Sequence, residues 1–427
     1  MKYQSPPGLF DILPDGETEP WKQSHLWHHV ESHLRQIAEL FCFREMRTPI
    51  IEKTELFTRS SGDMSDIVSK EMYSFKDRGG RDLSLKPEGT APAVRALLQA
   101  RAFEKNPYQK VYYFSPMFRY GRPQAGRYRQ HHQFGAEVFG VSHPDQDAEL
   151  IEFAYKAILK IGLKDIGVEV NSIGDSESRS SYRAALCDYL QKFESELSED
   201  SRQRLAVNPL RILDSKDPTD REICKGAPAL LEYLNTVSRT HFERVVSSLK
   251  ALKIPYQISN RLVRGLDYYT HTVFELMQFW GGEQEPLSLC GGGRYDGLVG
   301  ELGGRDLPAA GFGMGLERCI QALIAQNDTE ITRPVPLLTL IPLDEPSLEH
   351  ALIWASELRE QNISVQVDFS QRKLAKAMQQ ADRTGSRFVA VIGSDECLQH
   401  LLKVKEMKSG NETVVKFEEL SSWLHRR

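Results

Sequence analysis

Hydrophobic residues recur at steps of three and four along residues 21–41, which predicts an amphipathic helix. Its apolar face carries Leu26, Val30, Leu34, Ile37 and Phe41. The next segment, residues 43–51, reads as extended chain, and Pro49 confines it to the edge of a sheet because proline has no amide hydrogen to donate. Two interpretations stay open for this edge strand, a seam between two subunits and an ordinary surface edge.

Residues 109–140 show a period-two alternation of side chains on both sides of a connection rich in turn residues. The return strand is expected from about Tyr128 to Phe139. The connection carries the turn formers Gly121, Pro123 and Gly126. We therefore predict a long antiparallel hairpin.

Residues from about 173 to 256 are polar and helix-prone and carry none of the motifs described below. We predict that they form an inserted helical module. Strands are then expected at residues 261–266, 269–277 and 287–290, and residues 308–313 lead into a further helix.

A polar stretch that ends in a proline, residues 327–334, is the best candidate for a linker between domains. Beyond it, residues 335–427 alternate short strand patterns with helical ones, which is typical of a small α/β domain on a mostly parallel or mixed sheet. We therefore predict an α+β protein with a larger domain over residues 1–326, which includes the insertion, and a smaller one over residues 335–427. Within the smaller domain, strands are expected at 337–341, 365–368 and 388–392 and helices at 348–361 and 374–384, followed by a hairpin and a short helix.

Composition narrows the class of protein. The chain has 427 residues and 54 Lys and Arg against 59 Asp and Glu, so its net charge of −5 disfavours a protein that merely coats nucleic acid. No apolar run approaches the roughly 18 residues of a membrane helix, and the N-terminal residues lack the apolar core of a secretory signal. The six cysteines include no CxxC pair, which fits reduced thiols in a cytoplasmic protein, and we expect no dedicated metal site.

The hairpin connection carries an unusual density of positive charge. Residues 119–132 contain four arginines and two histidines but no acid. The arginines are Arg119, Arg122, Arg127 and Arg129. A solvated basic loop is one interpretation, and a grip on a polyphosphate is the other, because guanidinium groups make bidentate contacts to phosphate oxygens. On the return strand, Gln133, Gly135 and Glu137 share one face, and the glycine leaves room for a small ligand.

Three further segments bring polar side chains together. Residues 86–90 form a tight turn with a carboxylate and a hydroxyl, which alone is an unremarkable loop. Residues 262–270 place an arginine, an aspartate and two tyrosines at a strand–turn–strand junction. Residues 291–297 form a glycine-rich loop without the spacing of a dinucleotide-binding fingerprint.

Residues 311–318 alternate glycine with larger residues and end in Arg318, within the first turn of a predicted helix. A cation there opposes the helix dipole at a cost of roughly 0.3–1 kcal/mol, which is tolerated more readily if the arginine meets an anion. The chain has no GxxxxGK[ST] sequence, so converging arginines would have to hold ATP in place of a phosphate-binding loop.

Taken in order along the chain, these features resemble the class II aminoacyl-tRNA synthetases. The strand around Pro49, the hairpin with Arg119 and the glycine-rich strand–helix with Arg318 resemble motifs 1, 2 and 3 of that class. The resemblance narrows to the histidyl-tRNA synthetases at residues 86–90, 264–270 and 291–297. The C-terminal segment resembles the anticodon-binding domain of a subset of the class, so the resemblance covers nearly the whole chain.

The resemblance implies an antiparallel catalytic sheet flanked by helices and a homodimer across motif 1. It implies that ATP activates L-histidine to histidyl-adenylate, that pyrophosphate leaves, and that the histidyl group passes to the 3′ end of tRNA(His). Mg²⁺ would accompany ATP without a dedicated protein site. The enzyme would work in the cytoplasm and without a membrane.

Carried over position by position, the resemblance implies three catalytic arginines. Arg119 would hold the α-phosphate of ATP, and Arg318 would hold the γ-phosphate and stack on adenine. Arg264 would stand beside the histidine carboxylate and the α-phosphate, where other class II enzymes place a metal-binding acid. Arg127 would add a further contact to ATP.

The remaining implied roles concern histidine and tRNA. The α-amino group of histidine would be received by Glu88, Thr90 and Gln133, and Gly89 would also belong to the histidine site. Glu137 and Tyr269 would bracket the imidazole ring. The wall of that pocket would add Tyr268 and Tyr295. In the hairpin loop, the acceptor end of the tRNA would meet Arg122 and Gln124.

Two positions depart from the family pattern. Lys86 stands where arginine is expected, and because lysine offers a point charge rather than a bidentate fork, we leave it out of the catalytic set. Gly121 replaces the acid usual two residues after the motif 2 arginine, which leaves open one contact to adenine or to the tRNA end.

Two rival interpretations use the same residues differently. A regulatory subunit of histidine biosynthesis resembles the catalytic core, but that group lacks the anticodon-binding domain and part of the catalytic set, and this chain keeps both. Class II synthetases of the prolyl, threonyl or glycyl type share the C-terminal domain but are disfavoured by residues 264–269 and by Glu137. ATP–pyrophosphate exchange with each standard amino acid would separate the three interpretations.

Basic residues also cluster in the predicted C-terminal domain. Arg372, Lys373, Lys376, Arg383 and Arg387 fall within 16 residues that contain one acid. On a helix, Arg372, Lys376 and Arg383 share a face. A solvated helix face is the simpler interpretation, but the resemblance to an anticodon-binding domain favours a stripe that faces RNA.

Overall fold

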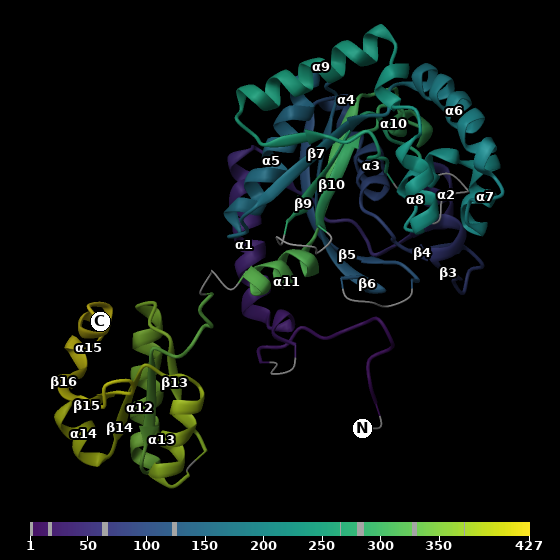
Figure 1. Cartoon of the computed structure of the whole chain (residues 1–427). Coiled ribbons are helices and arrows are strands. Elements are labelled where there is room, and N and C mark those ends of the chain that lie inside the picture. The colour runs from purple at the N-terminus through teal and green to yellow at the C-terminus, as the bar shows by residue number, and fades with distance from the viewer. Residues whose placement is uncertain are drawn as a thin grey trace. The chain divides into compact units, whose positions relative to one another are not determined.

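The computed structural model divides the chain into two compact units, Met1–Ile331 and Thr332–Arg427. The structure describes residues 3–15, 19–61, 67–121, 126–264, 266–279, 286–326, 331–370 and 372–427. The larger unit is built around an eight-stranded sheet and the smaller one around a five-stranded sheet (Figure 1). Within the described ranges, no helix has the length and apolar character to cross a membrane.

The eight-stranded sheet forms the centre of the larger unit. Its strands are β1 (Arg44–Glu45), β5 (Gln109–Phe118), β6 (Gln130–Phe139), β7 (Ile166–Ser172), β8 (Tyr256–Ile258), β9 (Thr270–Gln278), β10 (Leu287–Arg294) and β11 (Ala309–Gly315). They lie in the order β1-β5-β6-β11-β10-β9-β7-β8. The five inner pairs are antiparallel and the two outermost pairs are parallel. The predicted α+β class is confirmed, and so is the hairpin, in which β5 and β6 pair over their full length.

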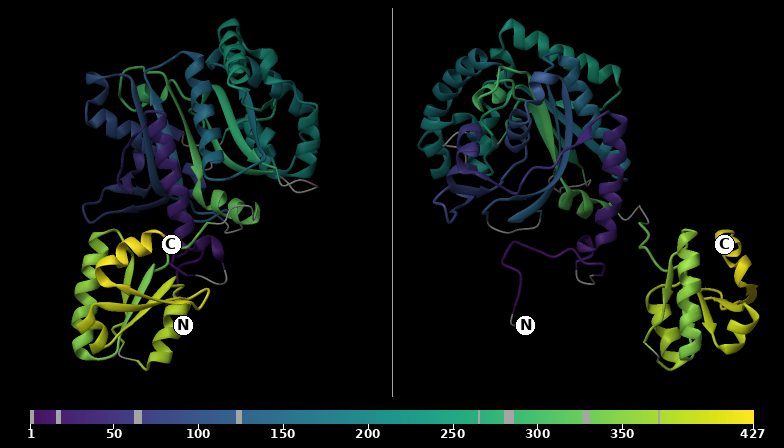
Figure 2. Two further views of the ribbon diagram at one scale, coloured as in Figure 1. Left: turned by 90° about the vertical axis from the view of Figure 1, so that its left-hand side faces the viewer. Right: turned by 180° about the vertical axis from the view of Figure 1, so that it is seen from behind.

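Long helices pack on one side of this sheet (Figures 1 and 2). They are α1 (Ser24–Leu40), α5 (Pro144–Lys160), α9 (Thr236–Ala251) and α11 (Leu316–Gln326). Phe153 of α5 meets Phe134 of β6 and Phe312 of β11, with ring centroids 6.0 and 5.3 Å apart. Because side chains alternate along a strand, the glycines that flank Phe312 face the opposite side of the sheet. That side is therefore left open.

The chain between β7 and β8 is helical, as expected for residues 173–256. It contains α6 (Ser176–Leu190), η3 (Gln191–Phe193), α7 (Glu199–Val207), η4 (Pro209–Asp214), α8 (Pro218–Lys225), η5 (Leu230–Tyr233) and α9. The four α-helices start at side chains that accept hydrogen bonds from the first helical turn, namely Asp175, Ser198, Asp217 and Asn235. The apolar core of this helical insertion is continuous with that of the sheet, since Tyr182 and Leu249 belong to the same buried cluster as Val170.

Residues 43–51 do not form the single edge strand expected from the sequence. β1 ends at Glu45, and β2 (Ile51–Lys53) belongs to a separate sheet with β4 (Asp82–Leu85) and β3 (Tyr73–Lys76), in the order β2-β4-β3. Pro49 lies between β1 and β2, and without an amide hydrogen it cannot continue either ladder. The other short elements of this unit are η1 (Pro20–Lys22), α2 (Thr54–Ser61), η2 (Ile67–Glu71), α3 (Thr90–Gln99), α4 (Ala102–Lys105) and α10 (Leu298–Glu301).

Two expectations next to the open face of the sheet are also wrong. Residues 261–264 and 266 form no strand, and β9 begins only at Thr270. The residues before β9 line a cavity instead of pairing with the sheet. Residues 291–294, expected as part of a loop, complete β10. The buried side chain of Arg294, which is 1% exposed, holds the end of β10 in the sheet through the ion network described below.

The smaller unit is an α/β domain on a mixed sheet. Its strands are β12 (Leu338–Pro342), β13 (Val365–Val367), β14 (Phe388–Ile392), β15 (Leu401–Glu406) and β16 (Glu412–Lys416), in the order β13-β12-β14-β15-β16. Its helices are α12 (Glu345–Glu360), α13 (Leu374–Arg383), α14 (Ser394–Gln399) and α15 (Phe417–His425). Trp354 stacks on Phe417 with ring centroids 4.8 Å apart at the centre of this fold. The element order follows the expectation, apart from α14, which was not predicted.

A buried ion network joins α5, α9 and β10 of the larger unit. Asp147 is 2% exposed, accepts a hydrogen bond from Arg294 Nε at 3.0 Å, and lies 2.8 Å from His241 Nε2. Arg294 also donates to Asp296 at 3.0 Å and to the carbonyl of Val141 at 2.9 Å. Burial by itself would raise the pKa of Asp147, but the charges and hydrogen bonds of Arg294 and His241 lower that pKa to about 2.

Asp147→Asn should lower the free energy of unfolding by about 3–5 kcal/mol, because it leaves the buried Arg294 charge with one ionic partner fewer. The lowered pKa also sets the pH dependence in the parent protein. The contribution of Asp147 is present above its unfolded-state pKa, near 3.9, and is lost as the pH falls toward about 2. Denaturant unfolding of both proteins at a series of pH values measures the two effects.

The matched control is Asp145→Asn, which breaks an ion pair between the same helix and Arg244 at the surface. The pair with Arg244 is bidentate and Ser248 also donates to Asp145, but these groups lie at the surface. This variant should therefore lose less stability than Asp147→Asn does, namely about 1 kcal/mol. Equal stability of the Asp147→Asn and Asp145→Asn proteins at pH 7 would contradict the importance of the buried network.

Candidate active site

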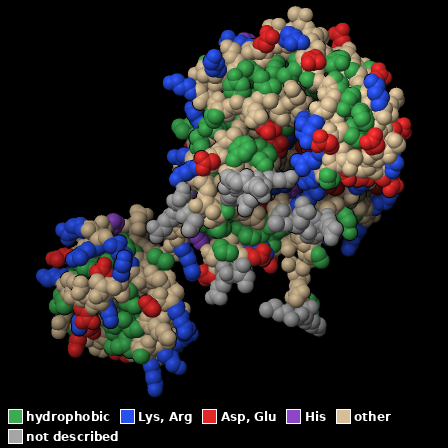
Figure 3. All heavy atoms as spheres, in the orientation of Figure 1, with side chains coloured by type: hydrophobic (Ala, Val, Ile, Leu, Met, Phe, Trp, Pro, Cys, Tyr) green, Lys and Arg blue, Asp and Glu red, His purple; other side chains and the backbone are tan. Residues whose placement is uncertain are grey.

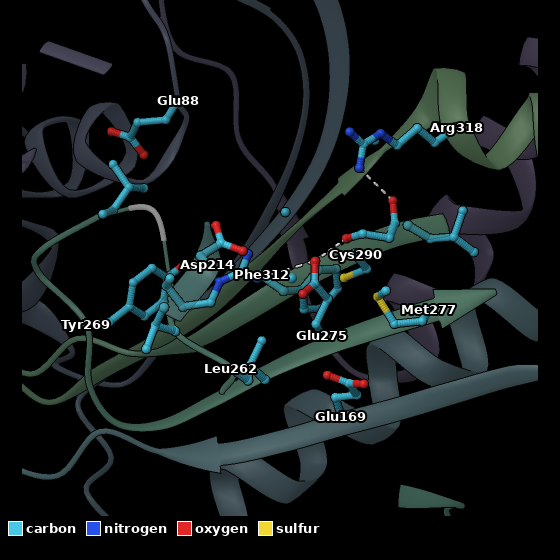
Figure 4. Close-up of a pocket in the computed structure, with 18 of the residues that line it drawn as sticks. Glu88, Glu169, Asp214, Leu262, Tyr269, Glu275, Met277, Cys290, Phe312 and Arg318 are labelled. Atoms are coloured by element: carbon cyan, nitrogen blue, oxygen red, sulfur yellow. Dashed lines mark hydrogen bonds and ion pairs between the residues drawn. The ribbon is translucent and has the colours of Figure 1, made fainter. Parts of the chain in front are cut away.

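The open face of the central sheet carries a cavity of about 1090 Å³. Its floor is formed by β10 and β11. Its walls are formed by the turn before α3, the base of the hairpin, residues 261–264, 266, 268 and 269, and part of the helical insertion (Figure 4). The residues predicted from sequence that line it are Glu88, Gly89, Thr90, Arg119, Arg127, Gln133, Arg264, Tyr268, Tyr269 and Arg318. Segments far apart in the chain therefore bring most of the expected site together.

Glycines in the floor let functional side chains lie directly on the sheet. A Cβ atom at Gly291 of β10 would come within 2.0 Å of Nη2 of Arg264. A Cβ atom at Gly311 of β11 would come within 1.7 Å of Oε2 of Glu137. Any other residue at these two positions would displace the arginine or the glutamate, so the glycine-rich strands are a requirement of the site.

Glu137 of β6 lies at the centre of a hydroxyl cluster. It is 1% exposed, and its Oε1 accepts hydrogen bonds from Thr90 Oγ1 at 2.8 Å and from the Tyr113 hydroxyl at 2.9 Å. The Tyr295 hydroxyl donates to its other oxygen, Oε2. Burial raises the pKa of Glu137 to about 8, because the three hydroxyl donors only partly replace the lost hydration.

Tyr113 is a site residue that the sequence reasoning missed. Its ring packs over Gly135, its partner across the hairpin, where an added Cβ would lie 2.2 Å from the ring. Its hydroxyl thereby reaches Glu137 from beneath the cavity. The period-two pattern that placed Gln133, Gly135 and Glu137 on one face applies equally to β5, and with the hairpin register it would have placed Tyr113 opposite Gly135 on that face.

Glu88 and Gln133 present polar atoms at the next part of the wall. The carboxylate of Glu88 accepts hydrogen bonds from the amides of Thr90 at 2.6 Å and Ala91 at 3.0 Å, at the start of α3. Burial nevertheless raises the pKa of Glu88. Oε1 of Gln133 is buried without a hydrogen-bond partner in the described part of the chain, so it can accept a hydrogen bond from a ligand.

Three arginines converge on the far side of the cavity. Arg119 donates through Nε to the carbonyl of Pro87 at 2.8 Å. Arg318 donates to the carbonyls of Gly126 at 3.1 Å and Ser288 at 2.8 Å. Burial lowers the pKa of both arginines, and the charge of Arg127 lowers both further. Arg127 repels each of the two, while Glu71 and Glu88 near Arg119 and Glu275 near Arg318 offset part of the positive charge. The three arginines nevertheless give this side of the cavity the guanidinium groups that a polyphosphate needs.

Arg264 meets acids that the sequence did not identify. Its Nη1 lies 3.7 Å from Oε1 of Glu275, on β9. Asp214, which comes from η4 of the helical insertion, lines the same cavity, and Figure 4 shows both acids between Tyr269 and Arg318. Burial raises the pKa of Asp214, and the charge of Glu275 raises it further. The two acids and Arg264 therefore form one coupled group.

Several predicted residues lie elsewhere. Glu137 and Tyr295 are buried behind the cavity surface, whereas Tyr268 and Tyr269 line it. Lys86 is fully buried and donates to the Thr48 hydroxyl at 2.9 Å, outside the cavity lining. Arg122 and Gln124, predicted to meet the tRNA acceptor end, lie outside the described residues.

Two protein families match this chain, one in each of its two units. Residues 16–319 match the family described as Histidyl-tRNA synthetase, and residues 338–427 match that described as Anticodon binding domain. The chain is 48% identical to a histidine–tRNA ligase of Protochlamydia amoebophila over 99% of this chain and 100% of that protein. It is 46% identical to one of Thermosynechococcus vestitus over 99% of this chain and 96% of that protein. The apo histidyl-tRNA synthetase structure from S. aureus superposes with a TM-score of 0.81 at 34% identity, covering 99% of each chain.

Glu137→Gln should flatten the pH dependence of stability in the neutral range. The folded protein keeps the Glu137 proton up to about pH 8, whereas the unfolded chain releases it near pH 4.3. The folded state thus binds more protons between these values, and the free energy of unfolding of the parent should fall as the pH rises through this window. Denaturant unfolding at pH 5, 6, 7 and 8 compares the slopes.

Tyr113→Phe is the matched control, because it removes one hydroxyl donor and keeps the titrating carboxyl. It should retain the slope of the parent protein. A Glu137→Gln protein with that same slope would show that Glu137 does not hold a proton in the folded state.

Proposed function

This chain belongs to the histidyl-tRNA synthetase family, and on that premise we propose that the cavity on the central sheet is where histidine and ATP react. Its activity is that of a histidine–tRNA ligase: ATP activates L-histidine to histidyl-adenylate with release of pyrophosphate, and the histidyl group passes to the 3′ end of tRNA(His). The proposal for the site rests on one observation, the meeting of arginines and a buried glutamate over the glycine-bearing face of the sheet.

Arg119, Arg264 and Arg318 are the catalytic cations in this proposal. The histidine carboxylate attacks the α-phosphorus of ATP, and like charge opposes the approach. The transition state spreads negative charge over the phosphoryl oxygens, and pyrophosphate leaves from the opposite side. Arg119 and Arg264 face the α-phosphate, while Arg318 and Arg127 hold the leaving phosphates. Cations that already point to these positions stabilise the transition state without reorganising.

Glu137 and Tyr269 recognise the imidazole ring. A ring N–H donates to a carboxyl oxygen of Glu137, and the Tyr269 hydroxyl meets the second nitrogen. A site built this way rejects amino acids that would leave its buried polar groups unpaired. Tyr113, Thr90 and Tyr295 orient the Glu137 carboxylate, which supports its role because a fixed acceptor discriminates better than a mobile one.

The α-amino group of histidine is received by Glu88, Thr90 and Gln133, and Gly89 borders the same site. The unpartnered Oε1 of Gln133 supports this role, because an ammonium group offers the donor that it lacks. The pocket wall is completed by Tyr268 and Tyr295. Residues Arg122 and Gln124 are proposed to contact the acceptor end of the tRNA.

Mg²⁺ is proposed to enter together with ATP. Among the residues that the structure describes, no three or more His, Cys, Asp or Glu side chains are grouped to hold a metal ion. Phosphate oxygens and water would therefore supply most of its ligands, as is usual for this ion. Loss of histidine-dependent exchange in the presence of a chelator, and its return with added Mg²⁺, would test the requirement. Because the substrates are cytoplasmic, the cytoplasm is the proposed location, which cell fractionation would check.

Residues 1–326, with the insertion at about 173–256, are proposed to be the catalytic domain, residues 327–334 the linker and residues 335–427 the anticodon-binding domain. The basic stripe of the smaller unit supports RNA binding, since Arg372, Lys376 and Arg383 are exposed on or beside α13. Figure 3 shows Lys and Arg side chains gathered on this unit. Contacts of this kind set affinity for the phosphate backbone more than they affect the chemical step.

Two copies of the chain are proposed to form a homodimer across motif 1. Exposed apolar side chains support this surface, namely Leu40 at the end of α1, Ile50 and Ile51 at the start of β2, and Phe75 on β3. Sedimentation equilibrium should give twice the mass of the chain. A protein that stays monomeric at micromolar concentration would overturn this part of the proposal.

Arg264→Ala should lower the rate of histidine-dependent ATP–pyrophosphate exchange by a factor on the order of 10²–10³, because one preorganised charge at the phosphoryl anion is lost. The fold should remain, since Arg264 borders a cavity rather than filling the core. Arg261→Ala, at an exposed position of the same cavity, is the control and should keep the parent rate. Near-normal exchange in a folded Arg264→Ala protein would remove this residue from the catalytic set.

Removal of Thr332–Arg427 should leave pyrophosphate exchange measurable and raise the KM for tRNA by about tenfold or more, because each lost phosphate contact weakens RNA binding. The experiment compares exchange and tRNA charging in the full chain and the truncated one. A folded, truncated protein that charges tRNA as well as the full chain would assign the smaller unit another task.

A further inference from the structure

The helical insertion holds the backbone that carries the two cavity tyrosines. Nη1 of Arg179, on α6, donates to the carbonyl of Tyr269 at 3.0 Å and reaches that of Asp267 at 3.4 Å. These carbonyls lie on either side of Tyr268. From the start of η4, Nδ2 of Asn208 donates to Oδ1 of Asp267 at 2.9 Å. Two side chains of the insertion therefore hold Asp267 and Tyr269, the residues on either side of Tyr268.

This wall has open space behind it. A second cavity of about 450 Å³ lies between α6 and η4 on one side and residues 263, 264, 266, 267 and 269 on the other. Four residues line both this cavity and the large one, namely Val263, Arg264, Leu266 and Tyr269. A segment bordered by cavities on both sides gains less from packing than a core strand does, so hydrogen bonds carry more of the task of fixing it.

The backbone hydrogen bonds of the central sheet do not hold this segment in place either. β9 begins only at Thr270, so residues 267–269 are outside the ladder of backbone hydrogen bonds. The position of Tyr269 thus depends on a guanidinium group that belongs to a different part of the fold. Burial lowers the pKa of Arg179, because its guanidinium group is partly withdrawn from water. A donor placed in this way is costly to leave without its acceptors.

We propose that Arg179 is a positioning residue of the histidine site, which fixes Tyr269 by holding the carbonyls of residues 267 and 269. This inference rests on the role proposed above for Tyr269. It makes the helical insertion a working part of amino-acid recognition, because any displacement of α6 moves the segment that meets the imidazole ring. Asn208 acts in the same direction through the side chain of Asp267.

The test compares Arg179→Gln with Arg183→Gln in the full-length enzyme. Arg183 lies one turn further along α6 and lines the same second cavity, but it donates to the carbonyl of Val207 at 3.0 Å, within the insertion itself. Arg179→Gln should raise the KM for histidine in pyrophosphate exchange on the order of tenfold, the loss expected for hydrogen bonds from a charged donor. The KM for ATP should change by less than about twofold. Arg183→Gln should keep the parent KM for histidine.

Two further variants separate positioning from loss of folding. Arg179→Lys keeps a charged donor and should recover part of the histidine affinity. If Arg179 only stabilised the fold, the KM for histidine in these variants would instead change in parallel with the melting temperature. Asn208→Ala should raise the KM for histidine by a smaller factor. Equal KM values for histidine in Arg179→Gln and Arg183→Gln proteins that melt together with the parent would overturn the inference.

A double-mutant cycle distinguishes this inference from the proposal beneath it. Tyr269→Phe should itself raise the KM for histidine, and Arg179→Gln should add little on that background, because the two act through one hydroxyl. If Tyr269→Phe leaves the KM unchanged, the proposed histidine site is wrong, and the inference falls with it. If Tyr269→Phe raises the KM and Arg179→Gln does not, only the positioning role of Arg179 is wrong.

Discussion

The site depends on side chains that lie directly against the backbone of an antiparallel sheet. Arg264 rests on Gly291, and Glu137 on Gly311, at distances that a Cβ atom would not allow. For this contact, two neighbouring strands must carry glycines on one face, while the side chains on their other face pack against the helices. Phe312 of β11 anchors the strand by packing on Phe153 of α5. One face of β11 is therefore apolar and buried, and its other face carries only glycines beneath the site.

Arginine serves two different purposes in this fold, and its partners tell them apart. Arg294 is surrounded by Asp147 and Asp296, which neutralise it, and it joins helices to the sheet. Arg119 and Arg318 are instead held by backbone carbonyls, which orient a guanidinium group without cancelling its charge. Positive charge held in this way remains available to a polyphosphate, which is what electrostatic catalysis requires. Arg264 is intermediate, since Glu275 lies 3.7 Å away.

Patterns local in sequence were predictable, and features fixed by distant partners were not. The hairpin of β5 and β6 follows from alternation and turn residues that act over a few positions. The strand β14 follows from a short apolar run bounded by polar residues and glycine. Residues 43–51 were predicted as one strand because periodicity cannot show that the two ends join different sheets. Residues 291–294 looked like a loop because their glycines signal turns, yet the buried Arg294 holds them in β10. Tyr113 required the hairpin register as well as its own strand.

The helical insertion shows that some functional contacts leave no motif in the sequence. Arg179 acts on backbone carbonyls, and every residue of a chain carries a carbonyl, so no particular residue type is needed at the receiving end. Such a contact leaves no complementary pattern in the sequence, unlike an ion pair or a glycine that makes room for a side chain. The insertion therefore reads as a polar helical stretch without motifs. Its bearing on the site becomes visible only when α6 and residues 267–269, nearly ninety positions apart, are found side by side.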